Sequence, residues 1–193
     1  MTVKIYDTTL PEAIQGNLVT LKAFDTQHIY ASEYLKWLRD PEVVRTLNLP
    51  NYLQKQIEIG ELENYCNSRI SSKKDIFIAI HTAKSDAFIG TCKIAHIDCY
   101  AATADIGIMI GNKSYWGQGI GSETIRLLGK FAFEEMGLRK LTAGTMGTNL
   151  AMIRVFQKMG FILEGTIRQQ DKLETQYVDH ILLGCFKDEF KNF

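Results

Sequence analysis

The chain has 193 residues, a hydrophobic share of 46% and a formal net charge of zero at pH 7. This length fits one domain, covering residues 1–193, and the apolar share supplies a normal globular core. Zero net charge argues against a nucleic-acid partner, and the absence of a signal pattern or long apolar run argues against a membrane partner. The four cysteines lack C-x-x-C spacing, which argues against a metal site. We therefore expect a cytoplasmic protein without a metal.

Strand and helix periodicities follow one another along the chain. Asp25 or Thr26 can cap a first helix, and Pro41 either closes this helix or opens the next turn. Residues 1–16 have no clear period and are expected to form a loose arm. The expected strands cover residues 18–22, 75–81, 87–97, 105–110, 140–145, 161–168 and 176–187, and the other expected helices cover 53–70, 120–136 and 149–159. This order indicates a single mixed α/β domain around a twisted sheet.

The most informative stretch covers residues 105–136. A strand of alternating isoleucines leads into a turn, then into glycines at positions 117, 119 and 121, and directly into a helix that Gly137 can cap. Free N–H groups at such a helix start attract anions, and glycine lets a ligand approach the backbone closely. Ser122-Glu123 after the last glycine excludes a P-loop, and the glycine spacing does not fit a dinucleotide site. A tight turn without a ligand is the alternative.

Three segments of the chain resemble the GNAT superfamily of acyl-CoA N-acetyltransferases, in the branch of ribosomal-protein N-terminal and amino-sugar or polyamine acetyltransferases. Residues 115–123 are similar to the loop that holds the CoA diphosphate, residues 148–161 to the N-x-x-S…E-K-x-G-F element, and residues 37–43 to the segment after the first strand. The matching order and spacing cover about residues 17–187. The resemblance implies the GNAT fold, a central twisted, mostly antiparallel sheet flanked by helices.

The resemblance also implies an activity and a cosubstrate. An acetyl group would pass from acetyl-CoA to a primary amine, on a protein N-terminus or a small molecule such as an amino sugar, by direct attack. A homodimer is one expected assembly. The residues implied for acetyl-CoA binding are Ile108, Met109, Ile110, Trp116, Gly117, Gln118, Gly119, Ile120, Gly121, Ser122, Asn149 and Phe156.

Two residues are candidates for the base that deprotonates the amine. Asp105 aligns with a family glutamate that often serves as the base or relays to it, although a solvated strand-end carboxylate is equally consistent with the sequence. His96, on the neighbouring strand, is the second candidate because an imidazole titrates near neutral pH. A purely structural histidine is the alternative there. His180 either lines the acceptor side or packs as an ordinary residue.

The group that protonates the leaving thiolate is where the chain departs from the family. Phe156 stands where many members have a tyrosine, and Met152 where others have a serine. Neither can donate a proton, although a thiol pKa near ~8.5 lets CoA leave largely as the thiolate. Tyr115, Tyr177 and Ser122 are candidate replacements. The departure keeps a second hypothesis open, a catalytically silent acyl-CoA-binding module.

Two sets of side chains in the first half of the chain are candidates for acceptor recognition. Cationic and aromatic groups suit a sugar nucleotide, whereas a group of carboxylates suits a polyamine. A solvated helix surface is the alternative for both sets. The first set is Trp37, Arg39, Arg45 and Tyr52, and the second is Glu58, Glu61 and Glu63.

Overall fold

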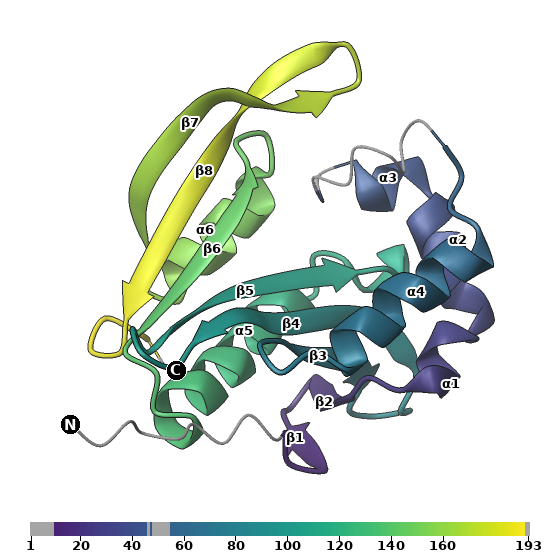
Figure 1. Ribbon diagram of the computed structural model, residues 1–193, viewed down its shortest axis with the longest axis horizontal. Coiled ribbons are helices and arrows are strands. Elements are labelled where there is room, and N and C mark those ends of the chain that lie inside the picture. The colour runs from purple at the N-terminus through teal and green to yellow at the C-terminus, as the bar shows by residue number, and fades with distance from the viewer. Residues whose placement is uncertain (1–9, 46, 48–54, 192–193) are drawn as a thin grey trace.

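The structure is a computed structural model that describes residues 10–45, 47 and 55–191 (Figure 1). The described residues form one eight-stranded sheet with the order β1-β2-β3-β4-β5-β6-β8-β7. Every neighbouring pair of strands is antiparallel except β5 and β6, which are parallel. The prediction of a mixed α/β fold with a mostly antiparallel sheet flanked by helices is therefore confirmed.

The element bounds follow the expected order of strands and helices. The strands are β1 (Ala13–Gln15), β2 (Val19–Ala23), β3 (Ile76–Thr82), β4 (Phe88–Asp98), β5 (Thr103–Ile110), β6 (Lys140–Met146), β7 (Ile162–Leu173) and β8 (Gln176–Phe186). The helices are α1 (Thr26–Ile29), α2 (Ser32–Arg39), α3 (Pro41–Val44), α4 (Ile59–Ile70), the short η1 (Lys113–Tyr115), α5 (Ile120–Lys130), its π-helical continuation η2 (Phe131–Glu135) and α6 (Leu150–Lys158).

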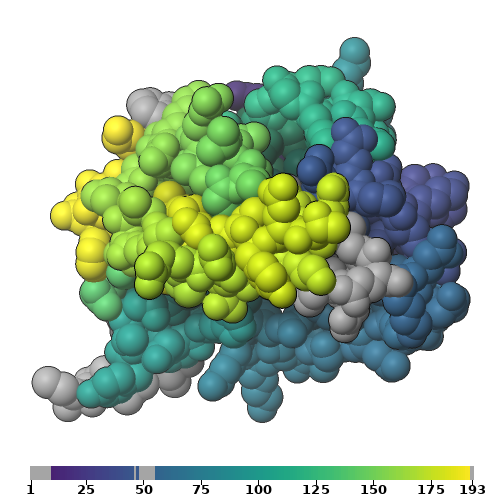
Figure 2. Space-filling view, turned by 90° about the horizontal axis from the view of Figure 1, so that it is seen from above, coloured from purple at the N-terminus to yellow at the C-terminus, as the bar shows by residue number. Residues whose placement is uncertain are grey.

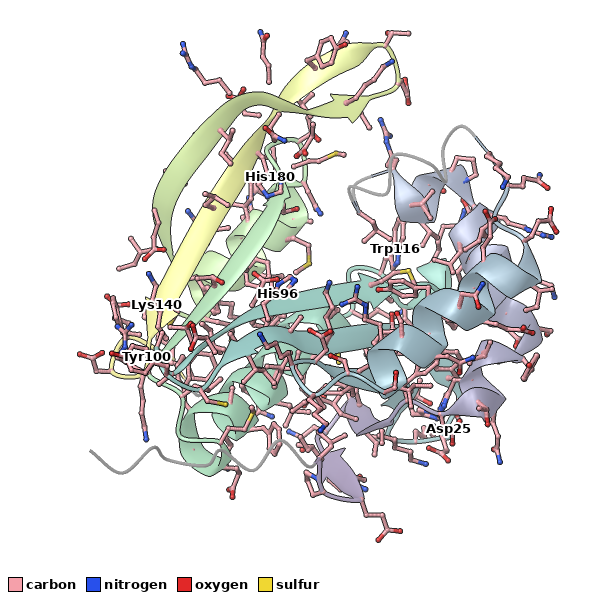
Figure 3. All side chains as sticks on the ribbon, in the orientation of Figure 1. Asp25, His96, Tyr100, Trp116, Lys140 and His180 are labelled. Atoms are coloured by element: carbon pink, nitrogen blue, oxygen red, sulfur yellow. The ribbon has the colours of Figure 1, made fainter. Side chains whose placement is uncertain are left out.

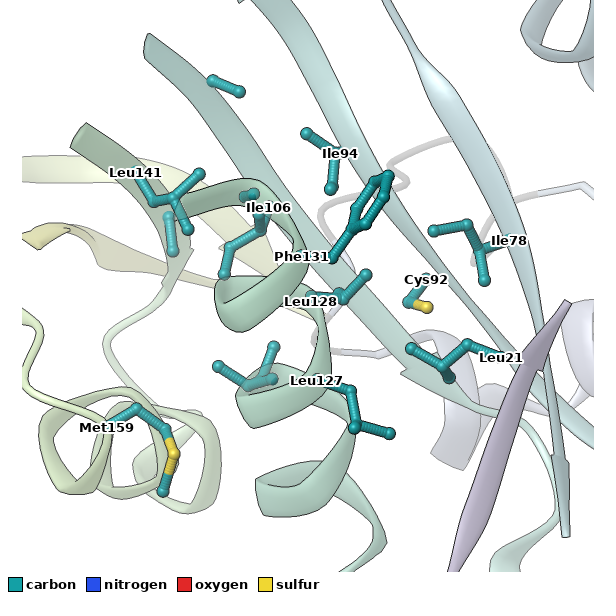
Figure 4. Packing of buried hydrophobic residues seen from close by; sticks show 14 of the residues in the cluster. Leu21, Ile78, Cys92, Ile94, Ile106, Leu127, Leu128, Phe131, Leu141 and Met159 are labelled. Atoms are coloured by element: carbon teal, nitrogen blue, oxygen red, sulfur yellow. The ribbon is translucent and has the colours of Figure 1, made fainter. Parts of the chain in front are cut away.

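The sheet lies between two helical layers, and each layer has its own core. On one face, Leu127, Leu128 and Phe131 of α5 and η2 pack against isoleucines of the central strands, including Ile78 and Ile106 (Figure 4). On the other face, the apolar sides of α1 to α4 pack against alternate residues of the same strands. Because side chains alternate between the faces of a strand, neighbouring residues of β5 serve different layers.

β5 and β6 pair over only a short distance and then separate. Residues 103–105 pair with residues 140–142, after which β5 continues beside β4 and β6 beside β8 (Figure 1). Alternate N–H groups of residues 106–110 therefore have no partner on β6, because only one of two successive N–H groups can point toward β4. This separation supplies both an opening in the sheet and free hydrogen-bond donors along one side of it.

The N-terminal segment differs from the expected loose arm. Residues 13–15 form β1 and pair with β2, and the buried Glu123 carboxylate accepts hydrogen bonds from the backbone N–H groups of Asn17, Leu18 and Val19 at 2.9, 2.6 and 2.9 Å. The arm prediction is therefore wrong for residues 13–16, since a buried carboxylate on α5 holds the turn between the two strands. Residues 1–9 of that prediction lie outside the described residues.

The helices before the central sheet also differ from their expected bounds. Three short helices replace the expected single one, because Asp25 caps α1 and Asp40 caps α3. Pro41 therefore begins α3 rather than closing a helix, a position where its missing N–H costs nothing. The helix expected from residue 53 begins at Ile59, and residues 53 and 54 lie outside the described residues. The last hairpin is longer than expected, since β7 continues to Leu173.

Candidate active site

A cavity of about 220 Å³ lies where β5 and β6 separate. Its lining comes from both helical layers, which indicates that it reaches through the sheet. From α6 and its N-terminal cap come Asn149, Met152 and Phe156, and from the opposite layer and sheet face come Tyr34, Leu38, Leu47, Tyr65, Phe77, Thr91 and Lys93. A second cavity adjoins it on the sheet and shares Asp105, Gly144 and His180 with the first.

The glycine loop is built to expose backbone. Gly117 and Gly119 have φ of 74° and 84°, values that glycine adopts without the strain a side chain brings. A Cβ added to Gly117 or Gly121 would meet nothing within 4 Å, so the surface around the first turn of α5 is open. The first N–H groups of a helix have no partner within it and favour an anion. These residues fit the diphosphate of CoA.

The side chains of the other predicted loop residues hold the loop in place. Ile120 is buried in the core, so only its backbone is available to a ligand. The side-chain amide of Gln118 donates to the Ser114 carbonyl, and the half-exposed Trp116 donates its indole N–H to the Ile110 carbonyl at 2.8 Å. The loop is therefore attached directly to the end of β5.

A lysine in front of the glycine loop connects it to the opposite helical layer. The ammonium of Lys113 lies 2.8 Å from Asp40 Oδ2 and 2.8 Å from Glu42 Oε2, at the junction of α2 and α3. The hydrogen bond from Lys113 lowers the pKa of Asp40, and the same bond raises the pKa of Lys113. Two residues of the segment 37–43 thus attach α3 to the loop.

Asn149 and Phe156, two of the residues predicted to bind acetyl-CoA, both line the cavity. Asn149 Oδ1 accepts the N–H of Met152 at 3.3 Å, so it caps α6 and lines the cavity at the same time. Phe156 is buried and packs against Phe161 with ring centroids 5.1 Å apart. Ile108 and Met109 line the cavity, and Ile110 lies beside them at the end of β5. This α6 side of the cavity offers apolar walls and no proton donor from residues 152 and 156.

Asp105 is the carboxylate at the point of separation. It alternates with Ile106, which faces α5, so the Asp105 side chain is on the face that α1 to α4 cover. Burial raises the pKa of Asp105, while the nearby Lys93 ammonium and a 3.2 Å hydrogen bond from Thr142 oppose that shift. A partly buried carboxylate with a raised pKa suits a base, since its proton affinity is closer to that of an amine.

His96 occupies a bulge in β4 near the same point. Its φ of 53° is left-handed, which is uncommon for a residue other than glycine, and the register between β4 and β5 shifts between Ala95 and Asp98. The backbone N–H of His96 donates to Asp75 Oδ1 at 3.0 Å, and its exposed side chain lines the second cavity together with Asp105 (Figure 3). The structure brings the two predicted base candidates to one cavity.

His180 lies at both cavities. It projects from β8, lines both cavities, and its Nδ1 lies 2.6 Å from Oδ2 of Asp171 on β7 (Figure 3). No sequence pattern pointed to Asp171. The two residues belong to different strands of a hairpin whose register is irregular, and periodicity alone carries no signal for their contact.

The candidate replacements for the missing thiolate acid lie elsewhere. Tyr177 is 65% exposed near the end of the hairpin, and Tyr115 packs against the core on the α5 side. Neither of them, nor Ser122, lines the two cavities. Their distance from the cavity lining argues against a role in proton transfer.

The side chains predicted for acceptor recognition have other partners. Arg39 donates to the Ile57 carbonyl at 3.0 Å, Trp37 is buried, and Arg45 pairs with Glu174 at 3.6 Å. Glu61 pairs with Lys55 at 2.8 Å, and neither set lines the two cavities. Tyr52 lies outside the described residues. Both acceptor sets are therefore surface or structural groups wherever the structure describes them.

Two general features of the described chain complete the picture of the site. Across residues 10–45, 47 and 55–191, no group of three or more His, Cys, Asp or Glu side chains is arranged to hold a metal ion. In the same residues, no helix is both long enough and apolar enough to cross a bilayer.

Comparison with known proteins identifies the family. The family described as "Acetyltransferase (GNAT) domain" matches residues 19–162. The N-acetyltransferase named YjcK of Bacillus subtilis is 36% identical over 122 residues, which are 63% of this chain and 67% of that protein. The p20 N-acetyltransferase of Bacillus licheniformis is 23% identical over 179 residues, covering 93% of this chain and 98% of that protein.

Solved structures with CoA share the fold. The ribosomal L7/L12 alpha-N-protein acetyltransferase RimL, in complex with coenzyme A, superposes with a TM-score of 0.79 at 22% identity and covers 92% of this chain and 99% of that one. The spermidine N-acetyltransferase from Vibrio cholerae, in complex with CoA and spermine, gives a TM-score of 0.78 at 16% identity and covers 90% of this chain and 98% of that one. The family match over most of the chain, together with this fold, shows that the chain belongs to the GNAT family of acetyl-CoA-dependent N-acetyltransferases.

Proposed function

We propose that the chain acetylates a primary amine that reaches the thioester from the face of the sheet covered by α1 to α4. The observation that carries this proposal is the separation of β5 and β6, with one cavity lined from both helical layers. The glycine loop and Asn149 would hold acetyl-CoA from the α5 and α6 side. Asp105 and the aromatic wall lie on the opposite side, where an acceptor can enter without displacing the cosubstrate.

The arrangement supports direct attack by the amine. Asp105 would take a proton from the ammonium group, which leaves a neutral nitrogen that can attack the thioester carbon. Free N–H groups of residues 106–110 would donate to the oxygen on which negative charge develops. Collapse of the adduct then breaks the C–S bond. Each of these groups belongs to β5, so one strand would position both the base and the oxyanion donors.

The lining of the acceptor side favours an amine attached to an apolar or aromatic group. Tyr34, Leu38, Tyr65 and Phe77 form most of it, whereas the ammonium of Lys93 is a cation within it. A polyamine would require several carboxylates, and the described lining contributes Asp105 alone. The ribosomal-protein enzyme and the spermidine enzyme are both less than 25% identical to this chain, so neither similarity indicates which of the two substrates it uses. A peptide N-terminus or a small apolar amine suits this lining best.

A variant of the glycine loop tests the cosubstrate site. Gly121→Asp places a carboxylate where the diphosphate should bind, and Gly121 has no positive φ that would strain the variant. We expect CoA binding to fall by at least 100-fold in calorimetry, with the fold retained. Gly60→Asp is the matched control, since a side chain at Gly60 on α4 also meets nothing within 4 Å. Equal CoA affinity of Gly121→Asp and wild type would contradict the assignment.

An acceptor screen tests the reaction itself. Release of free thiol from acetyl-CoA would be followed with N-terminal peptides, small aromatic amines, spermidine and amino-sugar nucleotides. We expect the fastest turnover with amines that carry an apolar neighbouring group. Preference for spermidine would contradict the proposed acceptor class.

A second candidate function is a silent acyl-CoA-binding module. The apolar side chains of Met152 and Phe156 at the cavity favour it, because they offer no proton to the leaving thiolate. Tight CoA binding without turnover of any amine in the screen would support this alternative. A cytoplasmic location and a homodimeric assembly stay predictions.

A further inference from the structure

β7 buries one carboxylate in an otherwise exposed strand. Asp171 is 2% exposed, whereas most of its neighbours along β7 face solvent. The register between β7 and β8 shifts between Ile167 and Asp171, and Gln169 in that bulge has a left-handed φ of 53°. The N–H of Gln169 donates to Asp179 Oδ1 at 2.9 Å, which holds the bulge. Backbone strain of this kind persists only where the surrounding structure imposes it.

The buried carboxylate holds an imidazole. Asp171 Oδ2 lies 2.6 Å from His180 Nδ1, and in the described structure the buried Oδ1 of Asp171 has no hydrogen-bond partner. The carboxylate is thus directed at the imidazole alone. An ionised carboxylate accepts only, so Nδ1 carries the hydrogen and Nε2 of a neutral His180 keeps its lone pair.

The Nε2 nitrogen of His180 lies beside Gly144 on β6. A Cβ added to Gly144 on β6 would lie 2.5 Å from His180 Nε2, so the imidazole rests against the β6 backbone only because residue 144 is glycine. His180 lines the first cavity together with Asp105, Met152 and Phe156. Nε2 therefore lies beside Gly144, a residue that lines both cavities.

Other titratable groups face His180 from three strands. Asp105 comes from β5, His96 from β4, and Asp171 and Glu164 from β7. Glu164 has its own partner, Lys140, at 2.6 Å. Asp171 is the group among these with a hydrogen bond to the imidazole, so Asp171 sets its orientation.

We propose that His180, positioned by Asp171, carries a proton from the attacking amine to the departing thiolate. The neutral amine nitrogen attacks the thioester carbon, forming a C–N bond and moving the carbonyl pair to oxygen. The proton on that nitrogen passes to Nε2, and the Asp171 carboxylate stabilises the imidazolium. When the carbonyl re-forms, the C–S bond breaks with its pair on sulfur, and Nε2 returns the proton to sulfur. Amine and thioester become amide and thiol, with His180 unchanged.

This role would supply the acid that Met152 and Phe156 lack. Two other proton carriers in the cavity, Tyr34 and Tyr65, are less suited to it. Burial raises the pKa of both tyrosines, so each holds its proton more tightly than an ordinary phenol. A neutral imidazole can accept and return a proton near neutral pH with little free-energy cost in either direction.

The inference rests on the proposed acetyltransferase function, and three variants test it. The acceptor in these assays is the amine that wild type acetylates fastest in the screen. It can be a peptide, an aromatic amine, spermidine or an amino-sugar nucleotide. His180→Gln and Asp171→Asn should each lower kcat by roughly 10²-fold, the usual scale for a general acid or base, with the KM for acetyl-CoA within about threefold of wild type. Both should also lose an inflection of the wild-type pH profile of kcat. Added imidazole should restore part of the rate of His180→Ala.

Three further variants separate proton transfer from a structural effect. Gly144→Ala should displace the ring and lower kcat, whereas the matched Gly165→Ala on β7, whose Cβ would lie 3.8 Å from Leu182, should retain the wild-type rate. Asp179→Asn keeps the oxygen that accepts the Gln169 N–H, so this variant should also retain the wild-type rate. Circular dichroism and CoA calorimetry on each variant report whether the fold and the cosubstrate site persist.

The outcomes distinguish this inference from the proposed function. Wild-type kcat and pH profile in a folded His180→Gln variant would overturn the proton carrier while leaving the acetyltransferase assignment intact. A rate loss without imidazole rescue, and with an unchanged pH profile, would make His180 structural and also overturn the inference. Wild-type protein that binds CoA and acetylates no amine would contradict both.

Discussion

At the scale of single residues, Asp105 combines a cost to stability with the proposed role of base in the reaction. Its position over the acceptor side of the sheet removes water from the carboxylate, which raises its pKa, and the bond from Thr142 and the charge of Lys93 compensate only in part. Lys93 and Asp105 are diagonal neighbours on one face of β4 and β5, since Lys93 pairs with Gly107 and Ala95 with Asp105. A partly buried ionisable side chain with a shifted pKa is typical of a functional site.

Asp105→Asn should therefore lower the rate and raise the stability. The pKa of Asp105 in the folded state lies above its unfolded value of about 3.9. The free energy of unfolding therefore falls as the pH rises from the unfolded to the folded pKa, and the full loss of stability is present at neutral pH. Asparagine keeps an oxygen for Thr142 and removes the charge. We expect kcat to fall roughly 10²-fold and the free energy of unfolding at pH 7 to rise.

Denaturant titrations at several pH values check the stability part of this prediction. The gain over wild type should disappear below about pH 4, where the aspartate is protonated in both the folded and unfolded chain. Asp98→Asn is a suitable comparison, because hydrogen bonds from Ala101 and Tyr100 lower the pKa of Asp98 and the sign should reverse. A loss of stability in Asp105→Asn at pH 7 would contradict this account.

At the scale of elements, α5 carries two separate functions in its first turn. Its first N–H groups would form the proposed diphosphate site, while the Glu123 side chain turns into the protein and accepts hydrogen bonds from three backbone N–H groups of the turn before β2. Arg126 lies 3.7 Å from the same carboxylate. The helix is thereby fixed to the sheet at the end where the cosubstrate would bind.

Glu123→Ala should destabilise the protein strongly, because it leaves three donors without their acceptor. An unsatisfied buried donor costs about 1–3 kcal/mol, so the free energy of unfolding should fall by at least about 3 kcal/mol in urea titrations. Glu123→Gln retains one acceptor oxygen and should lose less. Glu134→Ala, which removes an exposed carboxylate 4.0 Å from Lys130, is the control and should change stability by less than about 1 kcal/mol. Equal losses for Glu123→Ala and Glu134→Ala would refute the anchoring role.

At the scale of the whole molecule, contacts between the halves of the chain surround the active-site opening. Lys113 connects the glycine loop to α3, and Arg45 after α3 lies 3.6 Å from Glu174 at the end of the last hairpin. Figure 2 shows this region from above, where the yellow-green hairpin end meets the dark blue of α3. Ion pairs thus connect α3 and the residues that flank it both to the glycine loop and to the last hairpin.

Cosubstrate binding should therefore stabilise the entire domain. A ligand at 100 times its Kd adds about 2.7 kcal/mol to the free energy of unfolding. For a chain of this size that corresponds to a rise in Tm of roughly 5–10 °C. Thermal unfolding with and without CoA measures the shift, and Gly121→Asp, with at least 100-fold weaker binding, should show at most about 2 °C at the same concentration. A similar shift in Gly121→Asp would place the CoA site elsewhere.

The sequence by itself determined those features whose signals are local. Glycine spacing, the cap at Asp25 and the alternation of isoleucines predicted the loop, the start of the first helix and the central strands, because each depends on residues that are close together in the sequence. The family resemblance supplied the order of the elements. Asp105 and His96 were recognised as candidates in this way, although their common cavity was visible only in the fold.

Only the tertiary structure decided which polar groups meet. Asp171 and His180 are nine positions apart, and their contact depends on a bulge that shifts the register of β7, which no periodicity reveals. Glu58, Glu61 and Arg39 looked available to an acceptor, but a capping box and surface ion pairs already engage them. Strand register and side-chain pairing arise from packing between distant segments, and a sequence pattern records only which groups are present.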